Sequence, residues 1–574
     1  MKFCVQTLGC KVNQFETQAI ESILSERGHI PLLAGQGCDV CIINTCAVTA
    51  ESVRKSRQAV RRMKKLEPDA LIAVCGCLSQ LEPSMVEQIG ADLIGGSGGR
   101  REFALEIERL FQGSGNREQG TEVREQGTGI GKDANSLLLT PNSSLHSSPF
   151  TLNFEELPPG GVSGRTRALL KIQDGCDNFC AYCVIPYARG RARSLPPDRA
   201  AVQAALLDSL GFREIVVTGI EISAYGKDFH EDCPSDSPAS RNSEFLLRTL
   251  CSEDVFSLPF ELGAASVRLN SSRSASLLRL SEAKEMSPSP VLNNYNSELI
   301  YVLQKISASA PHARLRLGSL DPGAVTESFC RELSHIPNLC AHFHLSLQSG
   351  CDETLLRMGR KYDARGALDA IVSIRRSFPD CGITADLITG FPGETDAEFE
   401  QSLEFIKTAA FSGMHIFPFS PRSGTRAADM PDQIKKSDRL ERARIATAVA
   451  AGMAQAFRAS QVGKIVEVLF ERERGGYQLG HSGNYLEVAV KTGGAGSLGQ
   501  KSECSDFEAE FLPSKADFRR NTTGISRKYD EEPAEIPPKD GRLGLLSQAP
   551  RNTLCSVRIT GIGENGVVIG EMFD

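Results

Sequence analysis

Three cysteines directly after a predicted strand constrain this chain more than any other feature. Cys176, Cys180 and Cys183 follow the apolar segment ALLKIQD with the spacing C-x3-C-x2-C. Three thiolates on one short loop can hold three irons of a [4Fe–4S] cluster and leave the fourth iron open for a ligand. A structural zinc site takes four protein ligands, and no fourth cysteine or histidine lies nearby in the sequence. The spacing therefore predicts an iron–sulfur loop at the carboxyl end of a strand.

Short apolar strands alternate with helical segments on both sides of this loop, which predicts an α/β fold with mostly parallel sheets. The predicted strands are 2–8, 40–44, 71–74, 168–172, 214–218, 314–317, 342–347 and 383–388. After residue 460, short strands and glycine-rich turns predict a small antiparallel β-barrel.

Three polar stretches interrupt this pattern. One repeats REQGT and is rich in serine, threonine and asparagine. Segments with few large apolar side chains do not bury enough surface to order themselves, and insertions at loops cost little closure entropy. The predicted organisation is an N-terminal domain over 1–112, a low-complexity linker over 113–160, a core over 161–455 with an insertion at about 229–297, and a barrel over 460–574 with an insertion at about 492–550.

A second group of cysteines follows the first three strands. Cys10, Cys46 and Cys77 each come directly after a predicted strand. Because the carboxyl ends of parallel strands meet at one edge of a sheet, their thiolates can hold a second cluster. Free cysteines are also often small buried apolar side chains, and the spacing alone leaves both interpretations open.

Composition limits the other functional classes. The chain has 18 cysteines in 574 residues. It begins without a basic and apolar leader, so we expect a cytoplasmic protein whose thiols serve metal binding or catalysis. Because the net charge is −7, the protein as a whole does not attract a nucleic acid. Such a partner would have to bind to a local basic surface. No apolar run approaches the roughly 20 residues that span a bilayer, so no membrane partner is expected.

The cysteine loop resembles the signature of the radical S-adenosylmethionine (SAM) superfamily. LGCKVNQFET, INTCAV and GCLSQ resemble the cysteine motifs of its tRNA methylthiotransferase family. This resemblance implies a flavodoxin-like N-terminal domain and a partial (β/α) barrel. It implies a [4Fe–4S] cluster on Cys176, Cys180 and Cys183 that cleaves SAM to a 5′-deoxyadenosyl radical. A second [4Fe–4S] cluster is implied on Cys10, Cys46 and Cys77, with Asn44 and Gln80 nearby.

Later segments resemble the same family at successive strand ends: EIVVTGIEISAYG, RLRLGSLDP, HFHLSLQSGCDETLLRMGRKY and ITADLITGFPGET. The resemblance implies that SAM and substrate contact this set of residues, although an ordinary loop or cap role is an alternative for each polar member. The set is Gly219, Ser319, Gln348, Arg360 and Asp386.

Two regions are candidates for RNA contact. The C-terminal segment VGKIVEVLFERERGGYQLGHSGNYLEVAV resembles the TRAM domain, a small OB-like barrel that binds RNA. There His481, Asn484 and Tyr485 can stack on or hydrogen-bond to unpaired bases. Arg54, Arg57 and Arg61 share one helix face, which either contacts tRNA phosphates or is merely solvated.

The string LGCKVNQ resembles the branch that acts on N6-threonylcarbamoyladenosine beside the anticodon (position 37). That branch transfers a methylthio group to C2 and forms 2-methylthio-N6-threonylcarbamoyladenosine. The implied partners are the tRNA anticodon stem–loop, an electron donor of flavodoxin or ferredoxin type, and a sulfur source. Alternatives are methylthiolation of N6-isopentenyladenosine or of a ribosomal-protein aspartate. A non-catalytic electron-transfer or RNA-binding protein is an alternative of a different class.

Overall fold

The computed structural model describes residues 1–115, 153–159, 166–229, 297–492, 553–563 and 566–573. Met1–Gly226 and Asn296–Asp574 form one compact unit, and the short 3-10 helix η2 (Lys227–Phe229) is the described part of a second. Most of the predicted linker and both predicted insertions lie outside the described residues. No helix within the described ranges is long and apolar enough to cross a membrane.

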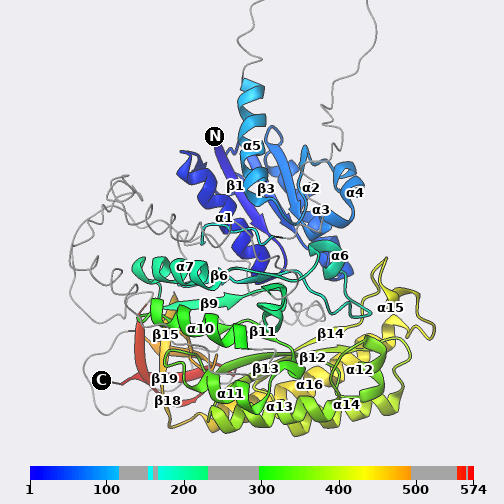
Figure 1. Cartoon of the computed structure of the whole chain (residues 1–574), viewed down its shortest axis with the longest axis vertical. Helices are drawn as coiled ribbons and strands as arrows, with labels where there is room; N and C mark the ends of the chain where they lie inside the picture. Colours follow the sequence, from blue (N-terminus) through cyan, green and yellow to red (C-terminus); the bar gives the residue numbers. More distant parts are fainter. Residues whose placement is uncertain (116–152, 160–165, 230–296, 493–552, 564–565, 574) are drawn as a thin grey trace, which may run out of the picture. The chain divides into compact units, whose positions relative to one another are not determined.

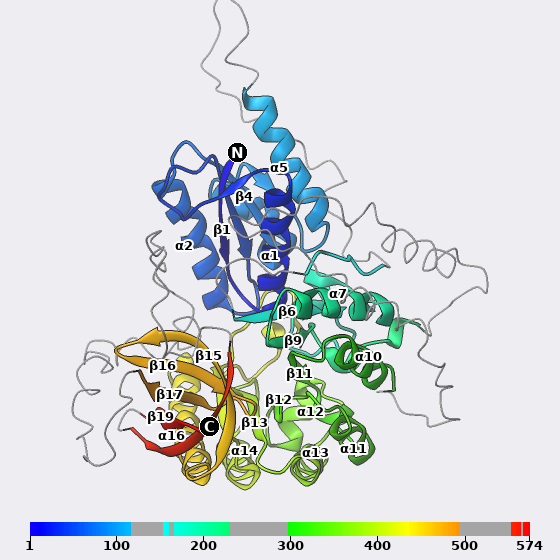
Figure 2. The ribbon, with the colours of Figure 1, turned by 90° about the vertical axis from the view of Figure 1, so that its left-hand side faces the viewer.

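A parallel sheet with helices on both faces forms the N-terminal domain. Its elements are β1 (Lys2–Thr7), α1 (Lys11–Glu26), β2 (Ile30–Pro31), β3 (Val40–Thr45), α2 (Ala50–Leu66), β4 (Leu71–Gly76), α3 (Cys77–Leu81), α4 (Pro83–Gln88), β5 (Leu93–Ile94) and α5 (Arg100–Gly115). The strand order β2-β1-β3-β4-β5 is that of flavodoxin, as expected. One core packs under α1 and α5 and a second under α2 and α4, on opposite faces of the sheet (Figures 1 and 2).

The end of the predicted linker differs from the expectation of a solvated segment. Leu157 is buried in the core under α1 and α5. Glu155 accepts a hydrogen bond from the backbone N–H of Arg100 (2.5 Å), and Glu156 pairs with Arg199 (2.8 Å). Phe154, whose ring lies 5.2 Å from Nζ of Lys171, adds a further contact, so 153–159 packs against the domain and is not solvated throughout.

The central region is a curved layer of parallel strands with helices outside it. Its elements are β6 (Arg167–Lys171), β7 (Gln173–Asp174), α6 (Ile185–Arg189), β8 (Arg193–Ser194), α7 (Pro197–Ser209), β9 (Glu214–Thr218), η1 (Ile222–Ala224), α10 (Ser297–Ser309), β10 (Arg314–Leu317), β11 (Ser319–Leu320), η5 (Pro322–Ala324), α11 (Glu327–Ser334), β12 (His342–Gln348), α12 (Asp352–Met358), α13 (Ala364–Ser377), β13 (Gly382–Thr389), α14 (Asp396–Ala409), β14 (Gly413–Pro418), α15 (Arg426–Asp429) and α16 (Lys436–Ser460). Sheets β10-β9-β6 and β11-β12-β13-β14 adjoin at Gly318, which alone separates β10 from β11. Helices α11, α13 and α14 cover the outer face (Figure 2), and this arrangement confirms the partial (β/α) barrel.

Alternation along β12 shows why one face of this layer stays open to ligands. Phe343, Leu345 and Leu347 are fully buried, whereas the intervening His344 and Ser346 are only partly buried. Successive side chains of a strand point to opposite faces, so the apolar set packs under the helices and the polar set faces the inside of the partial barrel. β13 has the same pattern.

The C-terminal strands close into a barrel. They are β15 (Ile465–Arg474), β16 (Tyr477–Ser482), β17 (Glu487–Lys491), β18 (Leu554–Ile562) and β19 (Val568–Met572), in the order β15-β16-β17-β19-β18. All neighbours are antiparallel except β17 and β19, which are parallel. The predicted small barrel is confirmed. One of its neighbouring pairs is parallel because a closed ring with an odd number of strands cannot alternate direction throughout.

Candidate active site

The loop that carries Cys176, Cys180 and Cys183 lies between β7 and α6. Gly175 opens it with a φ of +71°, and a Cβ at this position would lie 1.9 Å from the carbonyl oxygen of Arg191. Only glycine fits so close to another backbone. The loop is thus folded tightly, with the thiols of Cys176 and Cys180 buried and that of Cys183 partly buried.

The chemistry of these thiols fits a polynuclear cluster. Burial, reinforced by the neighbouring thiols, raises the pKa of Cys176 and Cys183 to about 12, so both are neutral until a metal replaces their protons. In a tetrahedral zinc site with bonds of about 2.3 Å, sulfur atoms lie roughly 3.8 Å apart. Among the described residues, neither cysteine trio has all its sulfur atoms within 4.8 Å of one another. The unligated thiols of both trios are thus spread more widely than the ligands of a bound zinc ion.

Charged groups from neighbouring loops lie beside the cysteine loop. Nη1 of Arg360 lies 3.3 Å from Sγ of Cys180, and Nη2 donates to Asp321 (2.7 Å). Glu221 follows β9 and lies close enough for its charge to raise the pKa of Cys176. Burial and then Asp321 raise the pKa of Glu221 itself to about 7. This carboxyl group is therefore poised to ionise when a cationic ligand arrives.

Gln173 connects the cysteine loop to the loop after β9. Its Oε1 accepts from the backbone N–H groups of Ile220 (3.0 Å) and Glu221 (2.9 Å), and its Nε2 donates to the carbonyl oxygen of Gly175 (2.8 Å). A Cβ at Gly219 would lie 2.8 Å from Oε1 of Gln173, so the predicted cofactor residue Gly219 is needed for this close approach. Sequence reasoning overlooked Gln173 and Glu221. The visible signal was a polar residue at the end of each apolar strand.

The other predicted SAM residues are spread along the open face. Ser319 is the register partner of His344 on β12 and is half-buried. Gln348 ends β12 with a φ of +67°, where the register with β13 shifts. Asp386 lies on β13 and pairs with His344 (3.3 Å). Of the predicted set, Arg360 contacts a cluster cysteine directly.

Glycine-dependent packing brings Cys10, Cys46 and Cys77 to one edge of the N-terminal sheet. Gly9 has a φ of +104°, and a Cβ there would lie 3.0 Å from Sγ of Cys46. Gly76 has a φ of +107° and packs against the backbone just before Cys46. Burial raises the pKa of Cys77 to about 12 and also raises that of Cys46, while Cys10 is exposed. The three loops therefore form one group with an open side.

The residues near this trio have structural contacts. Asn44 is fully buried and donates to the carbonyl oxygen of Asn13 (3.0 Å). Oε1 of Gln80 accepts from the backbone N–H of Ser97 (3.0 Å). Both side chains thus hold the cysteine-bearing loops in place.

Arg189, at the end of α6, joins the two cysteine groups. It donates to Oδ1 of Asn13 (2.6 Å), Oε1 of Glu16 (2.7 Å) and Oδ1 of Asp174 (3.1 Å). Oδ1 of Asn13 in turn lies 3.8 Å from Sγ of Cys10. Burial alone would lower the pKa of Arg189, but Glu16 and Asp174 raise it well above its usual value. The guanidinium is therefore a fixed charge between the two sites.

The predicted RNA residues fall into two environments. Arg54, Arg57 and Arg61 are exposed on α2, which begins just after Cys46. Tyr485 stacks between His342 and His481, with ring centroids 4.6 and 4.9 Å away, and Asn484 donates to Gln461 (3.1 Å). The barrel residues thus have partners within the chain, and their contact with RNA stays a prediction.

The partial (β/α) barrel and its three-cysteine loop define a radical SAM enzyme. Residues 290–406 match the Radical SAM superfamily, and residues 2–96 match the Uncharacterized protein family UPF0004. The chain belongs to the tRNA methylthiotransferase family. It is 30% identical to the Threonylcarbamoyladenosine tRNA methylthiotransferase MtaB of Bacillus subtilis over 84% of this chain and 89% of that protein.

A relative with a different substrate in its name is also similar. The tRNA-2-methylthio-N(6)-dimethylallyladenosine synthase of Symbiobacterium thermophilum is 27% identical over 81% of this chain and 83% of its own length. Among solved structures, the radical SAM methyltransferase TsrM of Kitasatospora setae is 14% identical, with a TM-score of 0.39, over 73% of this chain and 76% of that one. The superfamily match implies a [4Fe–4S] cluster and SAM as cofactors.

Proposed function

We propose that this enzyme transfers a methylthio group to C2 of N6-threonylcarbamoyladenosine, next to the anticodon of tRNA. The observation that carries the proposal is the contact of Arg189 with Asn13, Glu16 and Asp174, which joins a cysteine trio in each of two domains. A reaction that activates a C–H bond and then delivers sulfur needs two such sites side by side. Similarity to the Bacillus subtilis enzyme supports the choice of nucleoside.

Two [4Fe–4S] clusters fit the two trios: Cys176, Cys180 and Cys183 in the core, and Cys10, Cys46 and Cys77 in the N-terminal domain. A cluster held by Cys176, Cys180 and Cys183 would supply one-electron chemistry toward SAM, which suits the unactivated C2–H bond of the substrate. The chain's own residues hold the loops around this site in position. Arg360 lies against Cys180 and anchors the loop after α12, and Gln173 holds the loop after β9 in register with the cysteines.

Partners follow from this chemistry. The tRNA anticodon stem–loop is the substrate, and we expect the exposed arginines of α2, the helix after Cys46, to contact its phosphates. An electron donor of flavodoxin or ferredoxin type and a sulfur source complete the reaction. With tRNA as substrate, the proposed site of action is the cytoplasm.

Glu221 provides a pH-dependent test of SAM binding. SAM carries positive charge, so it binds best when Glu221 is ionised. With a pKa of about 7, this carboxyl group is mostly neutral at pH 6 and mostly charged at pH 8. Linkage then predicts that the Kd for SAM falls about tenfold from pH 6 to pH 8. Equilibrium dialysis of the reconstituted enzyme measures it. The Glu221→Gln variant will bind SAM weakly, with a Kd that does not change with pH. If its Kd instead depends on pH as in the wild type, Glu221 is excluded as the titrating group.

The proposed function is tested with three anticodon stem–loops in parallel. They carry N6-threonylcarbamoyladenosine, N6-isopentenyladenosine or plain adenosine at the same position. The full chain, reconstituted anaerobically and supplied with SAM and reductant, is expected to methylthiolate the first, as detected by mass spectrometry of the nucleosides. Preferred modification of the isopentenyl stem–loop would overturn the choice of substrate, and no modification of any stem–loop would overturn the activity.

A further inference from the structure

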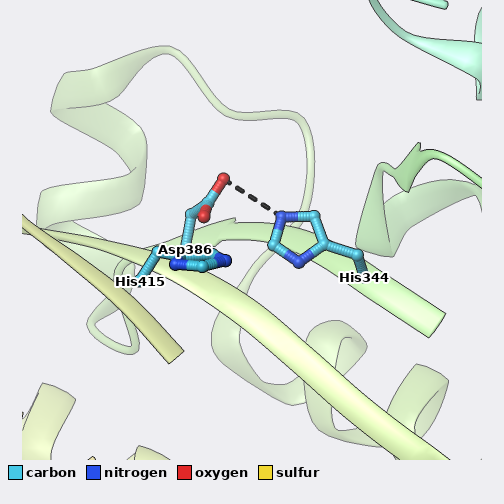
Figure 3. A group of neighbouring side chains, drawn as sticks. All are labelled: His344, Asp386 and His415. Carbon is cyan, nitrogen blue, oxygen red and sulfur yellow. Dashed lines mark ion pairs between the residues drawn. The ribbon is translucent and has the colours of Figure 1, made fainter. Parts of the chain in front are cut away.

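Three polar side chains meet on the open face of the partial barrel. His344 on β12, Asp386 on β13 and His415 on β14 place one ligand atom each within 4.8 Å of the others. Figure 3 shows the ring of His344 directed at the carboxylate of Asp386, with His415 beside it. The His344 side chain is 17% exposed and that of Asp386 24%, while His415 is exposed. The group is thus reachable from solvent.

Thr384 orients the His344 side chain of this group. Its Oγ1 lies 2.9 Å from Nδ1 of His344, which leaves Nε2 of the ring facing Asp386 (3.3 Å). The same Oγ1 lies 3.2 Å from Nε2 of the buried His342. Thr384 and Asp386 therefore hold the ring of His344 in one orientation.

The group lies close to the cysteine loop. Ser346 follows His344 by two residues on the same strand face, which corresponds to about 7 Å along the strand. Arg360, which contacts Sγ of Cys180, also donates to the carbonyl oxygen of Ser346 (3.2 Å). The group and the cysteine loop therefore share the open face of the partial barrel through Arg360.

We propose that His344, Asp386 and His415 bind the threonylcarbamoyl substituent of the substrate nucleoside. This inference rests on the proposed function. The substituent carries a carboxylate, a hydroxyl and ureido N–H groups. His415 can donate an imidazole N–H to its carboxylate. Asp386, held in place by Nε2 of His344, can accept from its hydroxyl or ureido N–H.

An apolar substituent does not match this surface. A dimethylallyl group has no hydrogen-bonding atom. If it covered these side chains, they would lose their hydrogen bonds to water and gain none in return, which costs free energy. A site built to hydrogen-bond its ligand rejects analogues that lack the polar groups. Binding by this group would favour the threonylcarbamoyl nucleoside over the dimethylallyl one.

A divalent cation is the competing occupant. Two histidines and one carboxylate are also a known donor set for such ions. Elemental analysis of the reconstituted enzyme separates the two cases, because the clusters contain iron only. A stoichiometric amount of zinc, manganese or nickel that His415→Gln loses would overturn the proposal, and the absence of such a metal supports it.

The direct experiment compares kcat/KM for stem–loops that differ only in the N6 substituent. One carries the threonylcarbamoyl group and the other an N-alkylcarbamoyl group without carboxylate or hydroxyl. We expect the wild-type enzyme to prefer the first by about 10- to 100-fold, since a hydrogen bond to a charged group contributes that much discrimination. His344→Gln, His415→Gln and Asp386→Asn will each reduce this preference about tenfold, mainly through KM for the threonylcarbamoyl stem–loop.

His335→Gln is the matched control, because His335 is an exposed histidine that follows α11. It is expected to retain the wild-type preference, and iron content confirms that every variant holds its clusters. A preference that survives in all three site variants would overturn this inference alone. A wild-type enzyme that does not modify the threonylcarbamoyl stem–loop would instead overturn the proposed function.

Discussion

Alanine at Cys176, Cys180 and Cys183 will abolish SAM cleavage and methylthio transfer together. Alanine at Cys10, Cys46 and Cys77 will abolish only the transfer. The reason is the separation of the two trios: one lies in a core loop beside Arg360 and Glu221, and the other lies at the edge of the N-terminal sheet. Formation of 5′-deoxyadenosine and of the methylthiolated nucleoside, measured in the same reaction, will distinguish the two variants.

A third variant controls for the loss of buried thiols as such. Cys330 is buried in α11, away from both trios, so Cys330→Ala is expected to retain both reactions. Iron and sulfide content should fall by about half in each triple variant, because each retains one cluster. Methylthio transfer that persists without Cys10, Cys46 and Cys77 would refute the second cluster.

Replacing Arg189 with methionine will strongly destabilise the protein, by about 3–5 kcal/mol, because a buried carboxylate network then loses a central cation. Arg189 is fully buried, and it is shared by Glu16 and Asp174. The same loss will loosen α1, which begins directly after Cys10. Methylthio transfer is therefore expected to fall by roughly 10- to 100-fold, as when other supporting residues of metal sites are removed.

Arg191 is the matched control, two residues further along. Its side chain is 58% exposed and pairs with Asp177, so Arg191→Met should cost at most about 1 kcal/mol. Urea unfolding under anaerobic conditions gives the free energy of unfolding of both variants. The dependence of this free energy on urea concentration (the m-value) shows whether a substitution has changed the unfolded state. Equal stability of the two variants would mean that the Arg189 network contributes no more than a surface pair.

Much of the fold could be predicted from local sequence patterns. Strand 214–218 was predicted to its ends, since a continuous apolar run is followed there by a definite stop at Gly219. The parallel pair β17 and β19 was not predicted, because strand pairing in a ring depends on closure rather than on the pattern of any strand. The packing of 153–159 was also overlooked, because two apolar side chains in a short segment, Phe154 and Leu157, give no periodic signal.

The sequence by itself determined the class of chemistry and the α/β architecture. The spacing of Cys176, Cys180 and Cys183 lies within one loop, so no knowledge of the fold is needed to see it. Only the tertiary structure decided which distant side chains meet: Arg189 with Asn13 and Glu16, Glu221 with Cys176, and the His344, Asp386 and His415 group. These contacts depend on strand order and register, and the periodicity of individual segments leaves both undetermined.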